Sequence, residues 1–156
     1  MENKHWIQGD NVCESPLFRR SFYLEEVPAS ARLAVCGLGY FLLFVNGERV
    51  GDQEFIPAVT NYSSVLGCDT TYPVWEERSG YRCLYVVFDL LPFLKTGENV
   101  IGIQLGNGWY HQTKRVDEEK FIFGFPKLRY EFTMTFGNGE TAFLESGPET
   151  LWKPGE

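Results

Sequence analysis

Residues 128–136 read LRYEFTMTF, and large apolar side chains alternate with polar ones throughout this stretch. A period of two is that of a β-strand, in which successive side chains point to opposite faces of a sheet. The stretch therefore predicts a strand with one face in the core and the other in water. The members of the apolar face are Leu128, Tyr130, Phe132, Met134 and Phe136, and those of the polar face are Arg129, Glu131, Thr133 and Thr135.

Two turns next to such runs predict hairpins. Gly137-Asn138-Gly139 separates residues 128–136 from a second run at 141–144, and Asn46-Gly47 separates residues 40–45 from 48–50. Glycine and asparagine tolerate the positive φ angles of tight hairpin turns, and Asn-Gly is the pair best suited to a type I′ turn.

Further β-rich runs cover residues 17–24, 32–35, 81–88 and 100–105. The connector at residues 89–97, DLLPFLKTG, is too short for a parallel crossover helix and suits one helical turn ended by glycine. The chain thus holds about eight strands at the spacing of a sandwich or barrel. No segment shows a sustained helical period, and no internal repeat of a solenoid or propeller is visible.

Composition supports the same fold class. The 156 residues suit one domain, and aromatic residues, at 16% of the chain, fit a pleated, half-buried surface. Glycine and proline are spread along the chain as turn residues and not concentrated in a linker. We therefore expect residues 1–156 to form a single all-β domain, an antiparallel β-sandwich of the jelly-roll, galactose-binding-like type.

The charge and the N-terminal sequence bear on partners and location. The formal net charge of −7 repels nucleic-acid phosphates and anionic lipids, so we expect no nucleic-acid partner. Residues 1–10 show no basic region followed by an apolar stretch, and no run is long and apolar enough to span a bilayer. We expect no membrane partner and a cytoplasmic rather than a secreted location.

The cysteines Cys13, Cys36, Cys68 and Cys83 include no Cys-x-x-Cys pair. The two histidines of the chain do not supply the missing ligands of a zinc site. Two disulfides remain arithmetically open, but Cys36 and Cys83 lie inside apolar runs that look like strands. We therefore favour reduced, buried thiols that pack as small hydrophobes.

No catalytic constellation stands out. Nucleophilic catalysis needs an activated nucleophile with a base, and the chain has no Gly-x-Ser-x-Gly elbow that would use His111. A glycosidase needs two carboxyl groups flanking one bond, and nothing singles out a pair such as Asp52 with Asp117. The glycines at 102–108 lack the helix and the Lys-Ser/Thr ending of a phosphate loop. We expect no catalytic residue.

The most unusual local feature is GNGWYH at residues 106–111. Its glycines let the backbone bend, and the rings of Trp109 and Tyr110 carry polar tips. One interpretation is a loop that stacks a sugar ring on an aromatic face while Asn107 or His111 hydrogen-bonds its hydroxyl groups. The other is a buried aromatic anchor at one end of the sandwich, which is the commoner role of such rings.

Several segments, taken in order, resemble the N-terminal domain of bacterial α-L-rhamnosidases. They are SPLFRRSF at 15–22, GLGY at 37–40, VNGERVGD at 45–52, residues 57–62, GENVIG at 97–102 and GNGWY at 106–110. The resemblance covers most of the chain, and SGP at 146–148 with WKPG at 152–155 looks like the end of that domain. It is the shared order of these individually weak motifs that makes the resemblance specific.

The resemblance implies an accessory domain cut from a larger multi-modular enzyme, whose catalytic acids lie on a separate (α/α)₆ barrel. Some related sandwiches bind terminal L-rhamnose with a calcium ion, and others only support the barrel, so the implied partners are rhamnose-containing carbohydrate and adjacent modules of the same polypeptide. Our candidate substrate-binding residues, taken from the loop at 106–111 and from the loops that carry the other two, are Asp52, Tyr62, Asn107, Trp109, Tyr110 and His111.

Calcium needs hard oxygen ligands, which Asp52, Asn46, Asn61 and Asp69 could supply from loops. The spacing of these residues is not that of an EF-hand, and solvated loop acids are the commoner alternative. We assign no metal ligand to this chain from its sequence.

Overall fold

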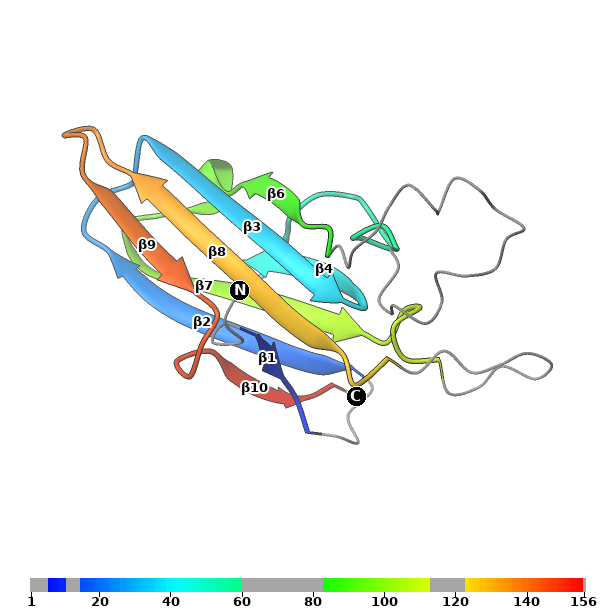
Figure 1. The fold of residues 1–156 in the computed structure, drawn as a ribbon. Helices are drawn as coiled ribbons and strands as arrows, with labels where there is room; N and C mark the ends of the chain where they lie inside the picture. Colours follow the sequence, from blue (N-terminus) through cyan, green and yellow to red (C-terminus); the bar gives the residue numbers. More distant parts are fainter. Residues whose placement is uncertain (1–5, 11–14, 60–82, 113–122, 156) are drawn as a thin grey trace, which may run out of the picture.

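The computed structural model describes residues 6–10, 15–59, 83–112 and 123–155. In these residues the chain forms two antiparallel sheets that pack face to face (Figure 1). Within the described ranges every element is a strand apart from one short 3₁₀ turn, η3 (Leu91–Phe93). The predicted all-β antiparallel sandwich is confirmed.

The first sheet is built around the strand that the sequence marks most clearly. Strand β8 (Lys127–Thr135) lies in its centre and pairs with β3 (Ser30–Leu38) on one side. On its other side β8 pairs with β9 (Thr141–Glu145) and with the two-residue β1 (Ile7–Gln8). Strand β6 (Val86–Asp89) pairs with the free side of β3 and forms one edge of the sheet.

The second sheet has the order β10-β2-β7-β4-β5. The long strand β7 (Gly97–Gly106) pairs with β2 (Pro16–Leu24) on one side and with β4 (Tyr40–Val45) on the other. Strand β5 (Glu48–Arg49) closes one edge through the Asn46-Gly47 turn, and β10 (Leu151–Pro154) pairs with residues 16–19 at the other edge. Both turn residues have positive φ, 53° and 86°, as the type I′ prediction requires.

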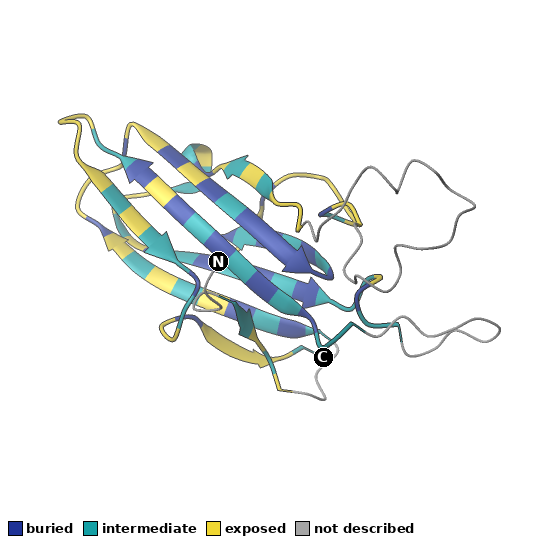
Figure 2. Ribbon diagram, in the orientation of Figure 1, coloured by how far each residue is buried: buried dark blue, intermediate teal, exposed yellow. Residues whose placement is uncertain are grey.

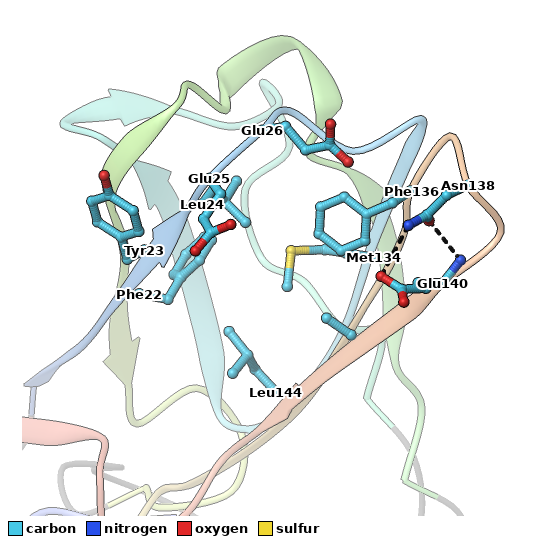
Figure 3. Close-up of a pocket in the computed structure, with 11 residues that line it drawn as sticks. Phe22, Tyr23, Leu24, Glu25, Glu26, Met134, Phe136, Asn138, Glu140 and Leu144 are labelled. Atoms are coloured by element: carbon cyan, nitrogen blue, oxygen red, sulfur yellow. Dashed lines mark hydrogen bonds between the residues drawn. The ribbon is translucent and has the colours of Figure 1, made fainter.

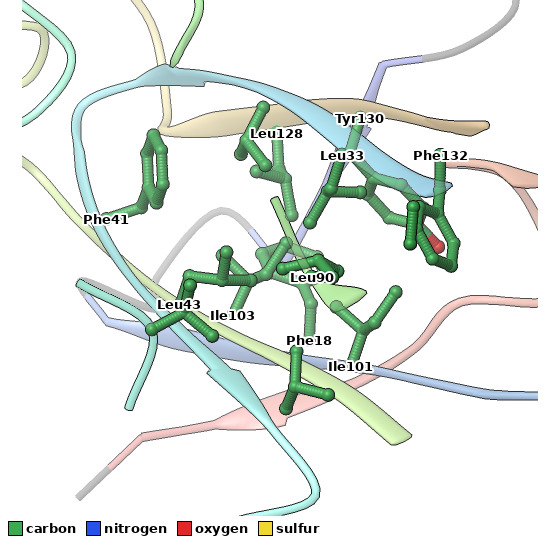
Figure 4. Packing of buried hydrophobic residues seen from close by; sticks show 14 of the residues in the cluster. Phe18, Leu33, Phe41, Leu43, Leu90, Ile101, Ile103, Leu128, Tyr130 and Phe132 are labelled. Carbon is green, nitrogen blue, oxygen red and sulfur yellow. The ribbon is translucent and has the colours of Figure 1, made fainter. Parts of the chain in front are cut away.

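The core lies between the two sheets, where the alternate side chains of their inner faces meet (Figure 4). Leu128, Tyr130 and Phe132 of β8 are buried together with Phe41 of β4 and Ile103 of β7. Removing each such side chain from water contributes about 1.5–3 kcal/mol to folding, so these facing rows hold the two sheets together. The apolar alternation predicted for residues 128–136 is confirmed.

Three details differ from the sequence-based expectation. Strands β1 and β10 were not predicted, because each is a short pairing that exists only where a neighbour offers an edge. The run at 81–88 becomes a strand only from Val86, and Cys83 lies before it. The helical turn in the connector is present, but it ends at Leu94, and Gly97, with φ of 95°, instead begins β7.

Burial alternates along each central strand and fades towards the edges (Figure 2). All four residues of β10 are exposed, in contrast to the central strands of the same sheet. The described ranges contain no helix with the length and hydropathy that crossing a membrane would require. Because exposure increases towards the sheet edges, the edges and the two ends of the sandwich provide the surface that a ligand or partner can reach.

Candidate functional site

The loop at residues 106–111 leaves the end of β7 and folds into a tight turn. The backbone carbonyl of Asn107 accepts hydrogen bonds from the amides of Tyr110 and His111, at 3.2 and 3.3 Å. Gly108 has a positive φ of 50° and lies against Tyr40, where a Cβ would come within 3.1 Å of the ring. At the start of β4, Gly39 approaches the carbonyl of Gly106 so closely that a Cβ has no room. The turn is thus held firmly against β4.

Two of the predicted site residues in this turn pack against the rings of Phe123 and Phe125. Tyr110 is only 8% exposed, and its ring packs on Phe123 at a centroid distance of 5.8 Å. Burial raises the pKa of the Tyr110 hydroxyl, and the neighbouring Cys83 raises it further. His111 stacks on Phe125 at 4.9 Å and places Nδ1 2.8 Å from the carbonyl oxygen of Gly124. Because a carbonyl only accepts, Nδ1 carries a proton and donates it to this oxygen.

Asn107 and Trp109 behave differently from these anchors. The amide oxygen of Asn107 is buried and takes no hydrogen bond from any described residue. The indole of Trp109 is 44% exposed. The turn therefore separates adjacent aromatic residues, with Tyr110 in the interior and Trp109 at the surface.

A second exposed ring lies at the same end of the sandwich. Phe55 is 72% exposed and meets the edge of Tyr40 at 5.5 Å, and Tyr40 is also the ring against which Gly108 lies. We call Tyr40, Phe55 and Trp109 the aromatic end. Sequence reasoning missed Phe55 and Tyr40, because only the return of the β5 loop to β4 brings them beside the turn.

The backbone at Phe55 has a φ of 58°, in the left-handed region that bulky residues rarely occupy. Neighbouring contacts hold it there. The Arg49 guanidinium donates to the carbonyl of Gln53 at 3.2 Å and lies 3.7 Å from the Glu54 carboxylate, while the amide of Phe41 donates to the carbonyl of Ile56 at 2.9 Å. Strain of this kind persists only where the surroundings fix it, and it is common at binding sites.

The remaining predicted residues lie outside this turn in the sequence, and the structure describes only some of them. Asp52 is exposed in the loop that leads to Phe55, and Tyr62 lies outside the described residues. Of the oxygen donors considered for calcium, Asn61 and Asp69 also lie outside them. The side-chain oxygen of Asn46 accepts a hydrogen bond from the backbone amide of Val100 at 2.9 Å, so it links the β4–β5 turn to β7. In the part of the chain that the structure describes, no three His, Cys, Asp or Glu side chains gather as metal ligands would.

A cleft of about 720 Å³ opens at the opposite end of the sandwich, between β2 and the β8–β9 hairpin (Figure 3). Its floor is apolar, with Phe22, Met134 and Leu144, and Glu25 and Glu140 stand on its rim. None of the predicted site residues lines it. Glu25 and the neighbouring Glu26 are both exposed. The rim carboxylates favour cationic or hydroxyl-bearing groups.

The two facing sheets, with loops gathered at both ends, define the chain as a β-sandwich module. The family model described as the α-L-rhamnosidase N-terminal domain matches residues 26–77 and 69–155, and the chain belongs to this family. An α-L-rhamnosidase of Formosa agariphila is 33% identical over 153 residues, which is 94% of this chain and 14% of that protein. The expected resemblance is confirmed.

Solved structures agree with this assignment. An α-L-rhamnosidase from Dictyoglomus thermophilum is 29% identical, with a TM-score of 0.70 over 91% of this chain and 13% of its own. An Aspergillus terreus α-L-rhamnosidase is 25% identical, with a TM-score of 0.79 over 98% of this chain and 17% of its own. The chain spans only about a seventh of the length of the curated relative from Formosa agariphila.

Proposed function

We propose that this chain is a non-catalytic accessory domain of a multi-modular α-L-rhamnosidase, and that its aromatic end helps to position rhamnose-containing carbohydrate. The family assignment supports the first part, and the relatives named above are α-L-rhamnosidases many times longer than this chain. The proposal makes hydrolysis the task of another module. Turnover of an aryl α-L-rhamnoside by this chain alone would contradict it.

The observation that carries the sugar-positioning proposal is the exposure of Phe55 and Trp109 on a rigid base. Sugar rings have apolar C–H faces and polar edges, so they stack on exposed aromatic rings while nearby polar groups bind the hydroxyls. Tyr40, Tyr110 and His111 anchor the loops beneath, which lowers the entropy that binding must remove. Asp52, on the loop that leads to Phe55, supplies a carboxylate near this surface.

The test is an NMR titration of the ¹⁵N-labelled chain with L-rhamnose and with an aryl α-L-rhamnoside, each with and without calcium. We expect the indole N–H signal of Trp109 to shift and that of Trp152 to stay in place. Trp152 is a matched internal control because it is 40% exposed but lies on β10. D-Galactose serves as the control sugar.

Variants then locate the site. Phe55→Gly should weaken the shift of the Trp109 indole signal. Trp109→Ala removes that signal, so its effect is followed on the backbone amides of residues 106–111, whose shifts should be abolished or weakened. Tyr23→Ala should leave these shifts unchanged, because Tyr23 is 71% exposed but lines the cleft at the other end. Shifts that depend on Tyr23 would move the sugar site to the cleft and contradict our assignment. A folded sample with no shifts at millimolar L-rhamnose would refute sugar binding by this chain.

A second candidate function is a scaffold that packs against neighbouring modules of the same polypeptide. It is favoured by β10, where Leu151 is 68% exposed and Trp152 lies beside it on a strand that is open to solvent throughout. Exposed apolar side chains on an edge strand are typical of a surface that a partner covers. We expect Leu151→Glu with Trp152→Glu to leave the isolated chain folded and to weaken its association with the rest of the enzyme, measured by size-exclusion chromatography. Unchanged association would count against the scaffold.

A further inference from the structure

Cys36 and Cys83 are far apart in the sequence but meet on the outer side of the first sheet. The antiparallel pairing of β3 with β6 ends at Val35 opposite Val86, one residue before Cys36 and three residues after Cys83. On the other side of β3, Cys36 lies opposite Arg129 of β8. The two thiols are close enough for each to shift the pKa of the other.

The two thiols differ in their access to solvent. Cys36 is 8% exposed, whereas Cys83 is exposed, which corrects the expectation that both are buried inside strands. Sequence reasoning failed here because the apolar run at 81–88 enters the sheet only at Val86. A reagent in solution therefore reaches the exposed Cys83 thiol before the buried Cys36 thiol.

The surroundings also activate Cys83. Its hydrogen bond with Cys36 lowers the pKa of the Cys83 thiol from its usual 9 to about 7, against the opposing effect of burial. The same contact, together with burial, raises the pKa of Cys36, although Arg129 opposes the rise. Among the described residues, Tyr110 interacts electrostatically with Cys83 and Arg129 with Cys36.

We propose that Cys83 and Cys36 are a thiol–disulfide exchange site that takes small-molecule disulfides of the glutathione class and closes an intramolecular disulfide. The geometry that carries the proposal is the antiparallel pairing of β3 with β6, which brings the segment with the exposed Cys83 thiol beside the strand with the buried Cys36 thiol. This site is independent of the proposed sugar-positioning function.

The chemistry proceeds in two balanced steps. The Cys83 thiolate attacks one sulfur of the small disulfide, an S–S bond forms between them, and the first small thiolate leaves and takes up a proton. The Cys36 thiol then loses its proton and attacks the sulfur of Cys83, which expels the second small thiolate. The protein pair is oxidised by two electrons, the small disulfide is reduced to two thiols, and the Cys83 thiolate that kept the pKa of Cys36 high no longer exists.

The experiment treats the native, reduced chain with oxidised glutathione and maps its disulfides by proteolysis and mass spectrometry without reduction. A Cys13→Ser/Cys68→Ser background removes the two cysteines that lie outside the described residues. We expect a peptide pair linked through Cys36 and Cys83, and a rise in the thermal midpoint of roughly 4–16 °C from closure of the loop. Dithiothreitol should reverse both changes.

Single variants separate the two roles. In Cys36→Ala, glutathione should remain bound as a mixed disulfide at Cys83, whereas Cys83→Ser should react with none because the buried thiol is out of reach. Circular dichroism checks that each variant is folded. If a variant does not fold, disulfide mapping of the wild-type chain still tests the proposal. Absence of the linked peptide from folded wild-type protein, or faster reaction at Cys36 than at Cys83, would overturn the proposal.

Discussion

The side chain of Asn46, in the β4–β5 turn, donates a hydrogen bond to the side-chain oxygen of Asn99 in β7 at 2.9 Å. Asn99 is fully buried, and its amide group also donates to the carbonyls of Lys95 and Gly97, at 2.6 and 3.0 Å. Its oxygen further accepts from the Lys95 amide at 3.0 Å. One buried amide thus holds the turn after η3, the start of β7 and the β4–β5 hairpin together.

We therefore expect Asn99→Ala to lower the free energy of unfolding by about 2–4 kcal/mol, because it leaves buried backbone groups without partners. Asn138→Ala is a suitable control, since among the described residues Asn138 forms side-chain hydrogen bonds only with Glu140, in an exposed turn. That control should cost about 1 kcal/mol or less. Urea unfolding followed by fluorescence measures the free energy of unfolding of the two variants. Equal losses of this free energy would contradict the prediction that the buried hydrogen bonds of Asn99 hold these segments together.

Tyr130 and Thr150 form a second buried link, with their hydroxyl oxygens 2.7 Å apart. The link ties the segment before β10 to β8, where the amide of Ser146 also donates to the carbonyl of Tyr130. We expect Tyr130→Phe to cost about 1–2 kcal/mol of stability, since it leaves the buried Thr150 hydroxyl without this partner. A double-mutant cycle with Thr150→Val should give a coupling energy of about 1 kcal/mol. A coupling near zero would mean that the hydroxyls act independently.

The left-handed backbone at Phe55 gives a prediction that separates strain from packing. Phe55→Ala and Phe55→Gly both remove the ring contact with Tyr40, but only glycine adopts a φ of 58° without a steric penalty. We expect the glycine variant to be more stable than the alanine variant by about 1 kcal/mol. Thermal unfolding measures the difference. The reverse order would show that this loop takes another backbone conformation in solution.

The reactivity of Cys83 should depend on pH in a defined way. Because its pKa is lowered from 9 to about 7, the reactive thiolate forms as the pH rises through 7, and an ordinary thiol reaches the same state about two units higher. We expect the rate of alkylation by iodoacetamide, followed by peptide mapping, to reach half its maximum near pH 7. Cys36→Ala removes the hydrogen bond that lowers the pKa and should shift this midpoint upward. An unshifted midpoint would rule out Cys36 as the cause.

The candidate site was predictable only in part. The composition of GNGWYH drew attention to residues 106–111, and its structural place at the end of β7 agrees with a loop that carries an aromatic ring to the surface. The sequence could not distinguish Trp109 from Tyr110, because both are large rings with polar tips. The turn anchored by the carbonyl of Asn107 determines which one is buried. The contribution of Phe55 depends on a loop that returns to Tyr40, and no local pattern signals such a return.

The sequence by itself determined the strands and hairpins of this protein, since alternation in residues 128–136 and the positive φ of Asn46-Gly47 depend on neighbours only a few residues away. Tertiary structure alone decided the pairings of β1 and β10, the exposure of Trp109 and Cys83, and the meeting of Cys83 with Cys36. The physical reason is that side-chain exposure and thiol contacts depend on which segments distant in the chain lie side by side. Two sheets packed around a common core fix those neighbours.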